Sequence, residues 1–297
     1  MINQREIDLN VGVFTIHISN RLTNNPAFQL PDSIDMFIDK QLVNQTIINY
    51  AIQLGEPYEV ADELLVSGFD NGPYPYFIYK YSTGEYLWVR ENKFNNIQFV
   101  FRISHNWDYW YLLVDNSKNP GIDSFKELAY IFGYSILGKG GILFHGVVME
   151  WRGIGIIVCA HSGVGKTTHT RMWRDREGAL ILNGDRALCC KEDNNWYAYG
   201  APWSGSSGEF KSRRVKLQAV VVLEQAANNE ISILSPLQGA FELMELAFAP
   251  DWQENLINCA LDSIDNIVNS IPVYKLKCRP DIEAVDVLKA ELEKLVT

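Results

Sequence analysis

The chain has 297 residues, of which 47% are hydrophobic and 12% aromatic; this is enough apolar material for one large domain or two smaller ones, and it excludes a disordered chain. The formal net charge of −10 disfavours a nucleic-acid partner, which would favour a basic face. The chain has five cysteines and no C-x-x-C pair, which predicts reduced thiols in place of a disulfide framework or a zinc site. No segment resembles a signal peptide, and no apolar run approaches the ~20 residues of a membrane span. We therefore expect a cytoplasmic protein.

Residues 1–120 contain short alternating runs, such as residues 11–18, that predict a mostly antiparallel, β-rich N-terminal domain. The runs 76–81 and 86–90 flank four turn residues and predict a hairpin, and 97–103 with 110–114 predict a second strand pair. A helix is expected near residues 33–54. The run at residues 116–121 is the best linker signal, so we expect domains at 1–120 and 121–297.

The second domain is expected to mix strands and helices. Residues 122–138 have the apolar spacing of a helix, and strands are expected at 142–150 and 154–159, paired across residues 151–153. Further strands fit 179–183, 187–191, 196–199 and 217–224, and helices fit 236–247, 252–269 and a segment from about 281. These elements predict an α/β (α+β) fold with C-terminal helices.

A phosphate-binding loop is the most informative motif, because it lies between an expected strand and an expected helix. Backbone N–H groups of such a loop and the positive end of the helix bind phosphate, which predicts ATP as cofactor. Lys166 is expected to reach the β- and γ-phosphates, and the Thr167 hydroxyl to bind Mg²⁺. The expected nucleotide-binding residues are His161, Ser162, Gly163, Val164, Gly165, Lys166, Thr167 and Thr168. Ala160 stands where the usual pattern has glycine, and the alternative is an ordinary glycine-rich turn.

Further polar residues flank this loop in the sequence. An apolar strand ending at Asp185 predicts a metal ligand, because a P-loop protein needs an acid to complete its Mg²⁺ shell; the alternative is a turn carboxylate, since Asn-Gly-Asp is also good turn chemistry. His145, beside Gly146, is alone more often a structural histidine. The glycine- and serine-rich residues 200–208 predict either a loop that closes over the site or a plain connection.

His145-Gly146, the loop Ser162-Gly163-Val164-Gly165-Lys166-Thr167 and the pair Asp185-Arg186 together resemble the catalytic core of the HPr serine kinase family, which is related to the phosphoenolpyruvate carboxykinase fold. The resemblance covers roughly residues 140–225. Within this range the chain looks like one branch of the HPr-kinase-like proteins, which includes kinases of lasso-peptide precursors. It implies transfer of a γ-phosphoryl group to a hydroxyl. It also implies that Lys166 holds phosphates, Thr167 and Asp185 bind Mg²⁺, His145 lies near the transferring group and Arg186 is one of the catalytic residues.

The chain departs from that family in its acids. HPr kinases have two adjacent acids before the arginine. If Arg186 anchors the alignment, the general-base position is Gly184; if a glycine-acid pair anchors it, Asp185 takes the base position and Arg186 the metal position. One acid then serves both roles, or His145, His161 or Asn183 assists. Cations that could neutralise the γ-phosphate are Arg186, Lys211, Arg213 and Arg214, although the last three also fit an exposed turn.

We therefore expect an ATP- and Mg²⁺-dependent kinase that phosphorylates a hydroxyl, preferably a serine of a peptide or protein. HPr itself is a doubtful substrate, because the glutamate-x-arginine-glycine run of HPr kinases is absent. The N-terminal domain is expected to recognise the acceptor or to mediate self-association into a homo-oligomer. The alternatives are a small-molecule kinase on the same core and a non-catalytic nucleotide-binding sensor or scaffold; a hydrolytic motor is weaker, because no arginine-finger signature is present.

Overall fold

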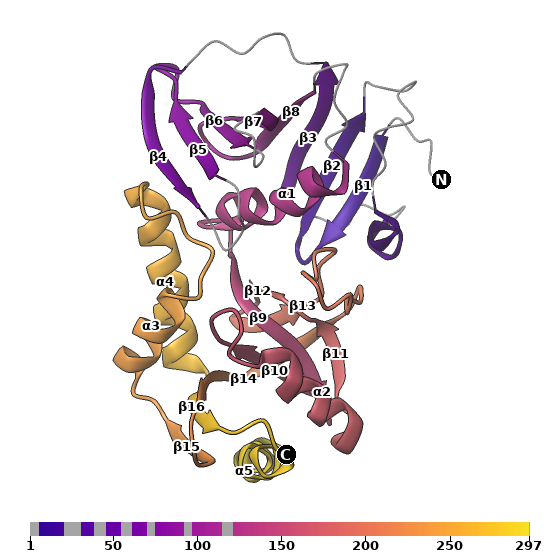
Figure 1. Ribbon diagram of the computed structural model, residues 1–297, viewed down its shortest axis with the longest axis vertical. Helices are drawn as coiled ribbons and strands as arrows, with labels where there is room; N and C mark the ends of the chain where they lie inside the picture. The colour runs from indigo at the N-terminus through magenta and orange to yellow at the C-terminus, as the bar shows by residue number, and fades with distance from the viewer. Residues whose placement is uncertain are drawn as a thin grey trace. The chain divides into compact units, whose positions relative to one another are not determined.

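The computed structural model describes residues 6–20, 31–38, 46–54, 61–69, 75–91, 97–114 and 121–296 (Figure 1). The chain forms two compact units, which divide between Ser135 and Ile136. The predicted α/β (α+β) class, with a β-rich N-terminal part and C-terminal helices, is confirmed. No helix among the described residues is long and apolar enough to cross a membrane.

The first unit contains one eight-stranded sheet. Its strand order is β1-β2-β3-β8-β7-β6-β5-β4, and all neighbours are antiparallel except β2–β3 and β3–β8. The strands are β1 (Glu6–Val11), β2 (Phe14–Asn20), β3 (Thr46–Leu54), β4 (Glu63–Phe69), β5 (Pro75–Lys80), β6 (Tyr86–Glu91), β7 (Ile97–Ile103) and β8 (Tyr109–Val114). The predicted hairpin is β5–β6 and the predicted second pair is β7–β8, so both predictions are confirmed.

Helix α1 (Gly121–Ile136) packs on this sheet through buried polar contacts. Glu127 accepts a hydrogen bond from Trp88 Nε1 at 2.7 Å and forms an ion pair with Arg90 at 2.6 Å. Trp110 Nε1 donates to Ser135 Oγ at 3.0 Å. Removing one partner of a buried ion pair leaves an uncompensated charge, so these contacts hold α1 firmly on the sheet. The compact units consequently divide after α1, later in the chain than the linker signal at residues 116–121, most of which lies outside the described residues.

The helix predicted near residues 33–54 is wrong for most of its length. Only Asp32–Phe37 is helical, as a short 3-10 segment, η1, and Thr46–Leu54 is strand β3. The strand forms because its β-branched residues suit a pleated sheet and alternate residues are buried, with Ile48, Tyr50 and Ile52 almost fully shielded from solvent. Residues 39–45 lie outside the described part of the chain.

The second unit is built on one connected eight-stranded sheet with two parts, which share the long strands β9 (Gly141–Trp151) and β14 (Arg214–Gln225). Strands β10 (Ile154–Cys159), β14 and β16 (Val273–Cys278) run parallel, and β9 joins them antiparallel to β10. On the other side β9 pairs with β12 (Arg186–Glu192), β12 with β13 (Asn195–Tyr199), and β13 with β14. The remaining strands are β11 (Leu180–Asn183) and β15 (Glu230–Ile233).

Every strand and helix predicted in this unit is present. The helices are α2 (Lys166–Glu177), α3 (Pro236–Met244), α4 (Glu254–Ser270) and α5 (Ile282–Leu292), followed by the 3-10 turn η2 (Glu293–Leu295). Strands β15 and β16 were not predicted. The sequence signal for β16 was the alternation in Val273-Tyr274-Lys275-Leu276-Lys277, in which Lys275 and Lys277 fall on one face of the strand.

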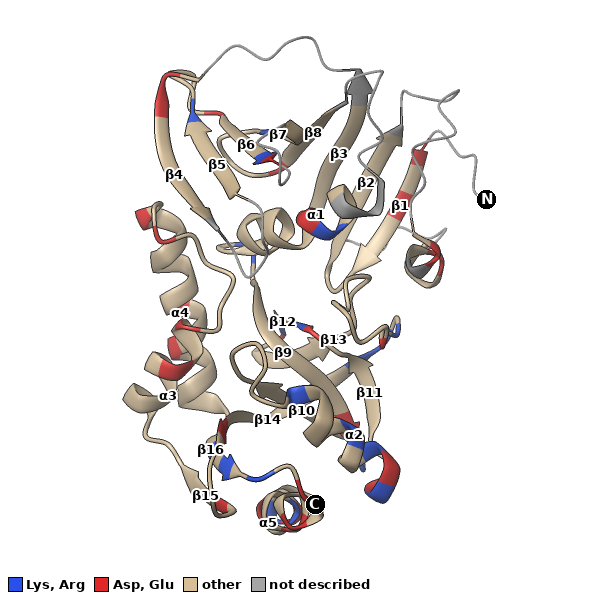
Figure 2. Cartoon of the chain, viewed as in Figure 1, with Lys and Arg blue, Asp and Glu red and all other residues tan. Residues whose placement is uncertain are grey.

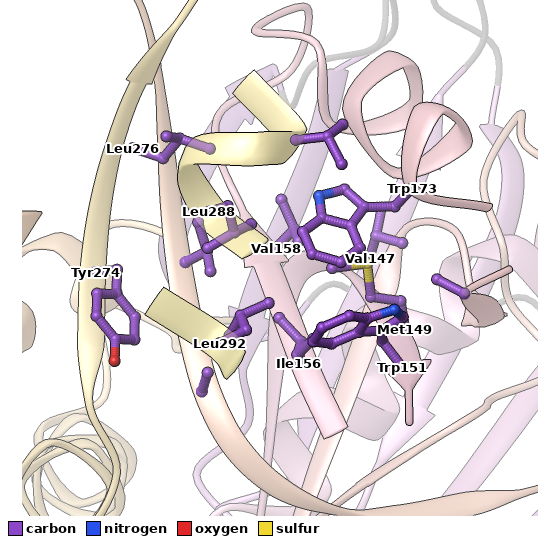
Figure 3. Packing of buried hydrophobic residues seen from close by; sticks show 14 of the residues in the cluster. Val147, Met149, Trp151, Ile156, Val158, Trp173, Tyr274, Leu276, Leu288 and Leu292 are labelled. Atoms are coloured by element: carbon purple, nitrogen blue, oxygen red, sulfur yellow. The ribbon is translucent and has the colours of Figure 1, made fainter. Parts of the chain in front are cut away.

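The core of the second unit lies between the parallel strands and the helices α2 and α5 (Figure 3). Ile156 and Val158 of β10 pack with Leu288 of α5. Trp151 and Trp173 meet edge to face, with ring centroids 5.3 Å apart. This packing fixes α2 directly beyond the carboxyl end of β10, where the phosphate-binding loop was predicted.

Strand β9 passes from one part of the sheet to the other between His145 and Gly146. His145 pairs with Arg186 of β12, whereas Gly146 pairs with Cys159 of β10. A Cβ atom at Gly146 would lie 2.9 Å from Cys159 Sγ and 3.2 Å from the Val158 carbonyl oxygen, so only glycine permits this approach. The passage places His145 beside the start of the loop that follows β10.

Candidate functional site

The loop between β10 and α2 has the conformation that an anion site requires. Gly163 (φ 82°) and Gly165 (φ 114°) are left-handed, and no atom lies within 4 Å of the position that a Cβ would occupy on either. No side chain caps α2 at Gly165, and its first turn contains no acid. The first amide groups of the helix are therefore available to a negatively charged ligand.

The other predicted loop residues differ in exposure. His161, Ser162 and Thr168 are exposed, and Thr167 is half-buried. Val164 packs against the core of the unit, and its carbonyl oxygen accepts a hydrogen bond from Gln225 Nε2 at 3.1 Å. The loop is thus held from the carboxyl end of β14 while its polar side chains stay open to solvent.

Lys166 is buried at the start of α2, with only 6% of its surface exposed. Its Nζ donates to the carbonyl oxygens of Ala160 at 2.7 Å and His161 at 3.2 Å, and lies 3.3 Å from His145 Nε2. Burial lowers the pKa of Lys166, and the negative charge of Asp185 partly opposes this. The ammonium group therefore ties the start of the loop to the start of α2, and it interacts electrostatically with Asp185.

Asp185 lies between two basic side chains. Its Oδ1 is 3.1 Å from His145 Nε2, and its Oδ2 accepts a hydrogen bond from the Arg186 guanidinium, which lies over the Phe248 ring at 4.8 Å. Burial by itself would raise the pKa of Asp185, but the hydrogen bond from His145 and the charge of Arg186 outweigh burial and lower it. Asp185 is consequently a charged carboxylate at neutral pH.

His145 Nε2 faces two competing partners. A ring nitrogen that donates its hydrogen to Asp185 cannot at the same time accept one from Lys166. With Nε2 protonated, His145 is tied to the carboxylate and Lys166 keeps one hydrogen beyond those given to the loop carbonyls. That remaining hydrogen is available to a ligand.

Asn183 is the residue whose role the sequence did not reveal. It is fully buried, and its Oδ1 accepts hydrogen bonds from the backbone N–H groups of Asp185 at 2.9 Å and Arg186 at 2.7 Å. Its Nδ2 donates to the carbonyl oxygens of Ala201 and Trp203, both at 2.9 Å. Asn183 therefore builds the turn that presents Asp185 and cannot act as a base. The Asn-Gly-Asp turn signal was correct, but the asparagine makes the turn and the aspartate is left for the site.

The glycine- and serine-rich loop, residues 200–208, packs on this turn. A Cβ on Gly184 would lie 2.0 Å from Ser207 Oγ, and a Cβ on Gly205 would lie 2.5 Å from Asp185 Oδ2. The loop therefore contacts the turn that carries Asp185, while its closing over a ligand stays a prediction. It also gives Gly184 a steric reason to be glycine, unconnected with a lost acid.

The basic cluster at residues 211–214 does not join the site. Arg213 pairs with Glu150 at 2.8 Å, and Arg214 binds both Glu192 and the Tyr199 hydroxyl. Arg214 begins β14, at the end opposite to the phosphate loop, because the carboxyl ends of β10 and β14 lie together. Lys211 is exposed. Of the four cations considered, the structure brings only Arg186 to the carboxylate of Asp185.

The residues present fit a magnesium ion that arrives with a nucleotide. Within the described parts of the chain, no group of three or more His, Cys, Asp or Glu side chains could hold a metal ion. Mg²⁺ commonly uses one or two carboxylates together with phosphate oxygens and water, and needs no such cluster. Thr167 carries a hydroxyl and Asp185 a carboxylate, and oxygen atoms are the ligands that Mg²⁺ prefers.

Residues 115–284 match the family model of the SynChlorMet cassette protein ScmC, which is more than half of the chain. The chain belongs to the ScmC family. The matched ScmC segment includes the phosphate loop, His145, Asn183 and Asp185. No curated protein matches the chain.

A similarity to a solved structure accompanies the family match. The HPr(Ser) kinase/phosphatase from Coxiella burnetii is 10% identical, with a TM-score of 0.32 over 52% of this chain and 99% of that chain. A structural similarity this weak does not assign a role to any residue of this chain. The roles considered for its site therefore rest on the contacts within the chain itself.

Proposed function

We propose that this protein uses Mg²⁺ and ATP to transfer a γ-phosphoryl group to a hydroxyl, with a serine of a peptide or protein as the preferred acceptor. The supporting observation is the convergence of His145, Lys166, Asp185 and Arg186 beside an open glycine loop. A glycine loop with a lysine fits a nucleotide phosphate. A half-buried carboxylate between two basic side chains adds what phosphoryl transfer needs beyond binding, namely positioning and charge stabilisation.

Each residue has a role that its position supports. The loop amides and Lys166 would bind the phosphates, and Arg186 would neutralise charge on the transferring group. Thr167 and Asp185 would hold Mg²⁺, which when bound neutralises phosphate charge. Asn183 fixes the Asp185-Arg186 turn through four hydrogen bonds, so it would keep the carboxylate in place during transfer.

His145 is the best candidate to accept the proton of the hydroxyl. Asp185 has a lowered pKa and is therefore a weak proton acceptor. His161 is exposed and lies 3.5 Å from Glu245, away from the carboxylate of Asp185. An aspartate against one ring nitrogen orients an imidazole, which is the relation between Asp185 and His145.

The test is transfer of label from γ-labelled ATP with Mg²⁺ into a host-cell lysate, resolved by mass. Lys166→Ala should reduce labelling by about 100-fold or more, because it removes a charged contact made in the transition state. Lys216→Ala, an exposed lysine of β14, is the matched control and should leave labelling unchanged. Labelling that survives Lys166→Ala would refute the site assignment, and label confined to small metabolites would make the acceptor a small molecule.

A nucleotide-binding sensor is the second candidate function. The observation that favours it is that both carboxylate oxygens of Asp185 already have protein partners, His145 and Arg186. A sensor predicts Mg·ATP binding, lost in Lys166→Ala, without transfer to any component of the lysate.

A further inference from the structure

Helix α3 carries large apolar side chains on its solvent-facing side. Leu237 is 68% exposed and Phe241 is 69% exposed; they are four residues apart and so lie on one face of the helix. Ile233, at the end of β15, is 66% exposed just before them. Single exposed apolar residues are normal, but three large ones close together in the chain, two of them on one helix face, are typical of a surface that binds another molecule. We call Ile233, Leu237 and Phe241 the α3 row.

The chain around this row is acidic and contains no base. Between Lys216 and Lys275 no lysine, arginine or histidine occurs, and the eight acids there are Glu224, Glu230, Glu242, Glu245, Asp251, Glu254, Asp262 and Asp265. Figure 2 shows the same pattern, with acidic and no basic positions on α3 and α4. Helices α3 and α4 pack against each other, so the acids of α4 belong to the same part of the unit as the α3 row.

Part of this negative charge is not neutralised within the protein. Lys275 pairs with Glu224 and Glu242. In contrast, the exposed acids of α4 form no ion pair with any residue that the structure describes; they are Glu254, Asp262 and Asp265. A ligand that covered the α3 row would therefore gain from carrying positive charge.

The α3 row leads directly to the candidate active site. Glu245 follows Phe241 by four residues and lies 3.5 Å from His161 of the phosphate loop. The next carbonyl oxygen, that of Leu246, accepts a hydrogen bond from the backbone N–H of His145 at 2.8 Å. The eight residue steps from Leu237 to Glu245, the C-cap of α3, span about 12 Å, which is roughly four residues of an extended peptide.

We propose that the α3 row binds a basic, amphipathic segment of the acceptor, placed a few residues from the hydroxyl that is phosphorylated. This inference rests on the proposed function. Charge disfavours a second copy of the chain as the occupant, because it carries the same net charge of −10.

The test measures binding without nucleotide, so that it does not depend on transfer. Fluorescence anisotropy of the full chain is recorded with two labelled peptides of about twelve residues, one alternating Lys and Leu and one alternating Glu and Leu. The basic peptide should bind, more weakly as salt rises, and the acidic peptide should not. Leu237→Ser/Phe241→Ser should weaken binding about 100-fold, because each of the two buried apolar side chains contributes about one power of ten. Ile282→Ser, on α5 and 47% exposed, is the matched control.

The outcomes separate this proposal from the proposed function. Equal binding of the two peptides, or unchanged binding by Leu237→Ser/Phe241→Ser, overturns the docking surface. A dimer in light scattering that this double variant converts to a monomer also overturns it, since the occupant is then a second copy. Peptide binding without any phosphoryl transfer overturns the proposed function alone. Transfer to the same acceptor with an unchanged KM in the double variant overturns the docking surface alone.

Discussion

The contact between Gly184 and Ser207 gives the sharpest test of how the site is built. A Cβ on Gly184 would lie 2.0 Å from Ser207 Oγ and 2.6 Å from Ser207 Cβ, whereas real Cβ contacts essentially never fall below 3.0 Å. Gly184 is not among the glycines with positive φ, so alanine meets a steric conflict and no backbone strain. Overpacking of this kind costs about 1–3 kcal/mol, and such short contacts place Gly184→Ala near the upper end.

A second substitution should remove most of that cost. Ser207→Gly deletes both contacting atoms, and the next neighbour of the new Cβ is Glu209 Cβ at 3.6 Å, an ordinary contact. By itself Ser207→Gly loses the hydrogen bond to the Ser204 carbonyl oxygen at 2.7 Å and that from the Glu209 N–H, about 1 kcal/mol each. The double variant should therefore be no less stable than Ser207→Gly alone, which makes the coupling free energy about 3 kcal/mol.

Urea denaturation of the four proteins at 25 °C measures this coupling. Purely additive effects of Gly184→Ala and Ser207→Gly would refute the packing of the loop on Gly184. The same cycle tests whether Gly184 is a lost base position. Gly184→Asp alone cannot answer that question, because Ser207 blocks the side chain. If Gly184→Asp/Ser207→Gly transfers phosphate faster than Ser207→Gly, a base is missing at this position; an unchanged rate supports His145 as the proton acceptor.

Three further predictions concern single residues. Asn183→Asp replaces two donors facing the Ala201 and Trp203 carbonyl oxygens with acceptors, so it should lower the free energy of unfolding by roughly 2–5 kcal/mol in urea, and an unchanged midpoint would contradict the hydrogen bonds described. Gly146→Ala should cost about 1–3 kcal/mol in the same assay, because the added Cβ would lie 2.9 Å from Cys159 Sγ. The pKa of Lys166 is lowered from 10.5 in the folded protein. Between this folded-state pKa and 10.5, the unfolded chain therefore binds more protons than the folded protein does. The free energy of unfolding of the nucleotide-free protein should consequently increase as pH rises through that window. Lys166→Met should raise the melting temperature at pH 7 and remove this gain while ending transfer; a lower melting temperature in Lys166→Met would be inconsistent with the burial of a charged lysine.

The sequence was sufficient to predict those helices and strands whose signal lies within one contiguous segment. The strand, glycine loop and helix from Ile154 to Glu177 are contiguous, and their periodicity and glycines predicted them with nearly correct boundaries. The helix wrongly predicted near residues 33–54 arose because a short apolar segment fits both the helical and the strand period. Burial of this segment within the sheet makes it strand β3.

The contacts that complete the site are long-range and could be predicted only through the resemblance. His145 and Asp185 are 40 residues apart and meet because β9 pairs with β12. Nothing in the sequence shows that Ser207 contacts Gly184, so the absent second acid was open to interpretation as a lost base. Nor does it show that Asn183 binds four backbone groups, since an Asn-Gly-Asp turn has no preferred partner in the chain.

The charges at the site provide a last argument that its ligand is an anion. Lys166 and Arg186 bring two positive charges to one carboxylate, Asp185, in a mostly buried site of a chain whose net charge is −10. A negative ligand would interact favourably with the buried Lys166 ammonium group, which donates its hydrogen bonds to the neutral carbonyl oxygens of Ala160 and His161. Pyrophosphate, which lacks the adenosine, should therefore stabilise the protein by itself. At 100 times its Kd the gain is about 2.7 kcal/mol, visible as a rise in melting temperature. Lys166→Met should abolish most of that rise, while Lys216→Ala should keep it. A melting temperature unaffected by pyrophosphate and Mg²⁺ would mean that the positive charges serve the fold and not a phosphate ligand.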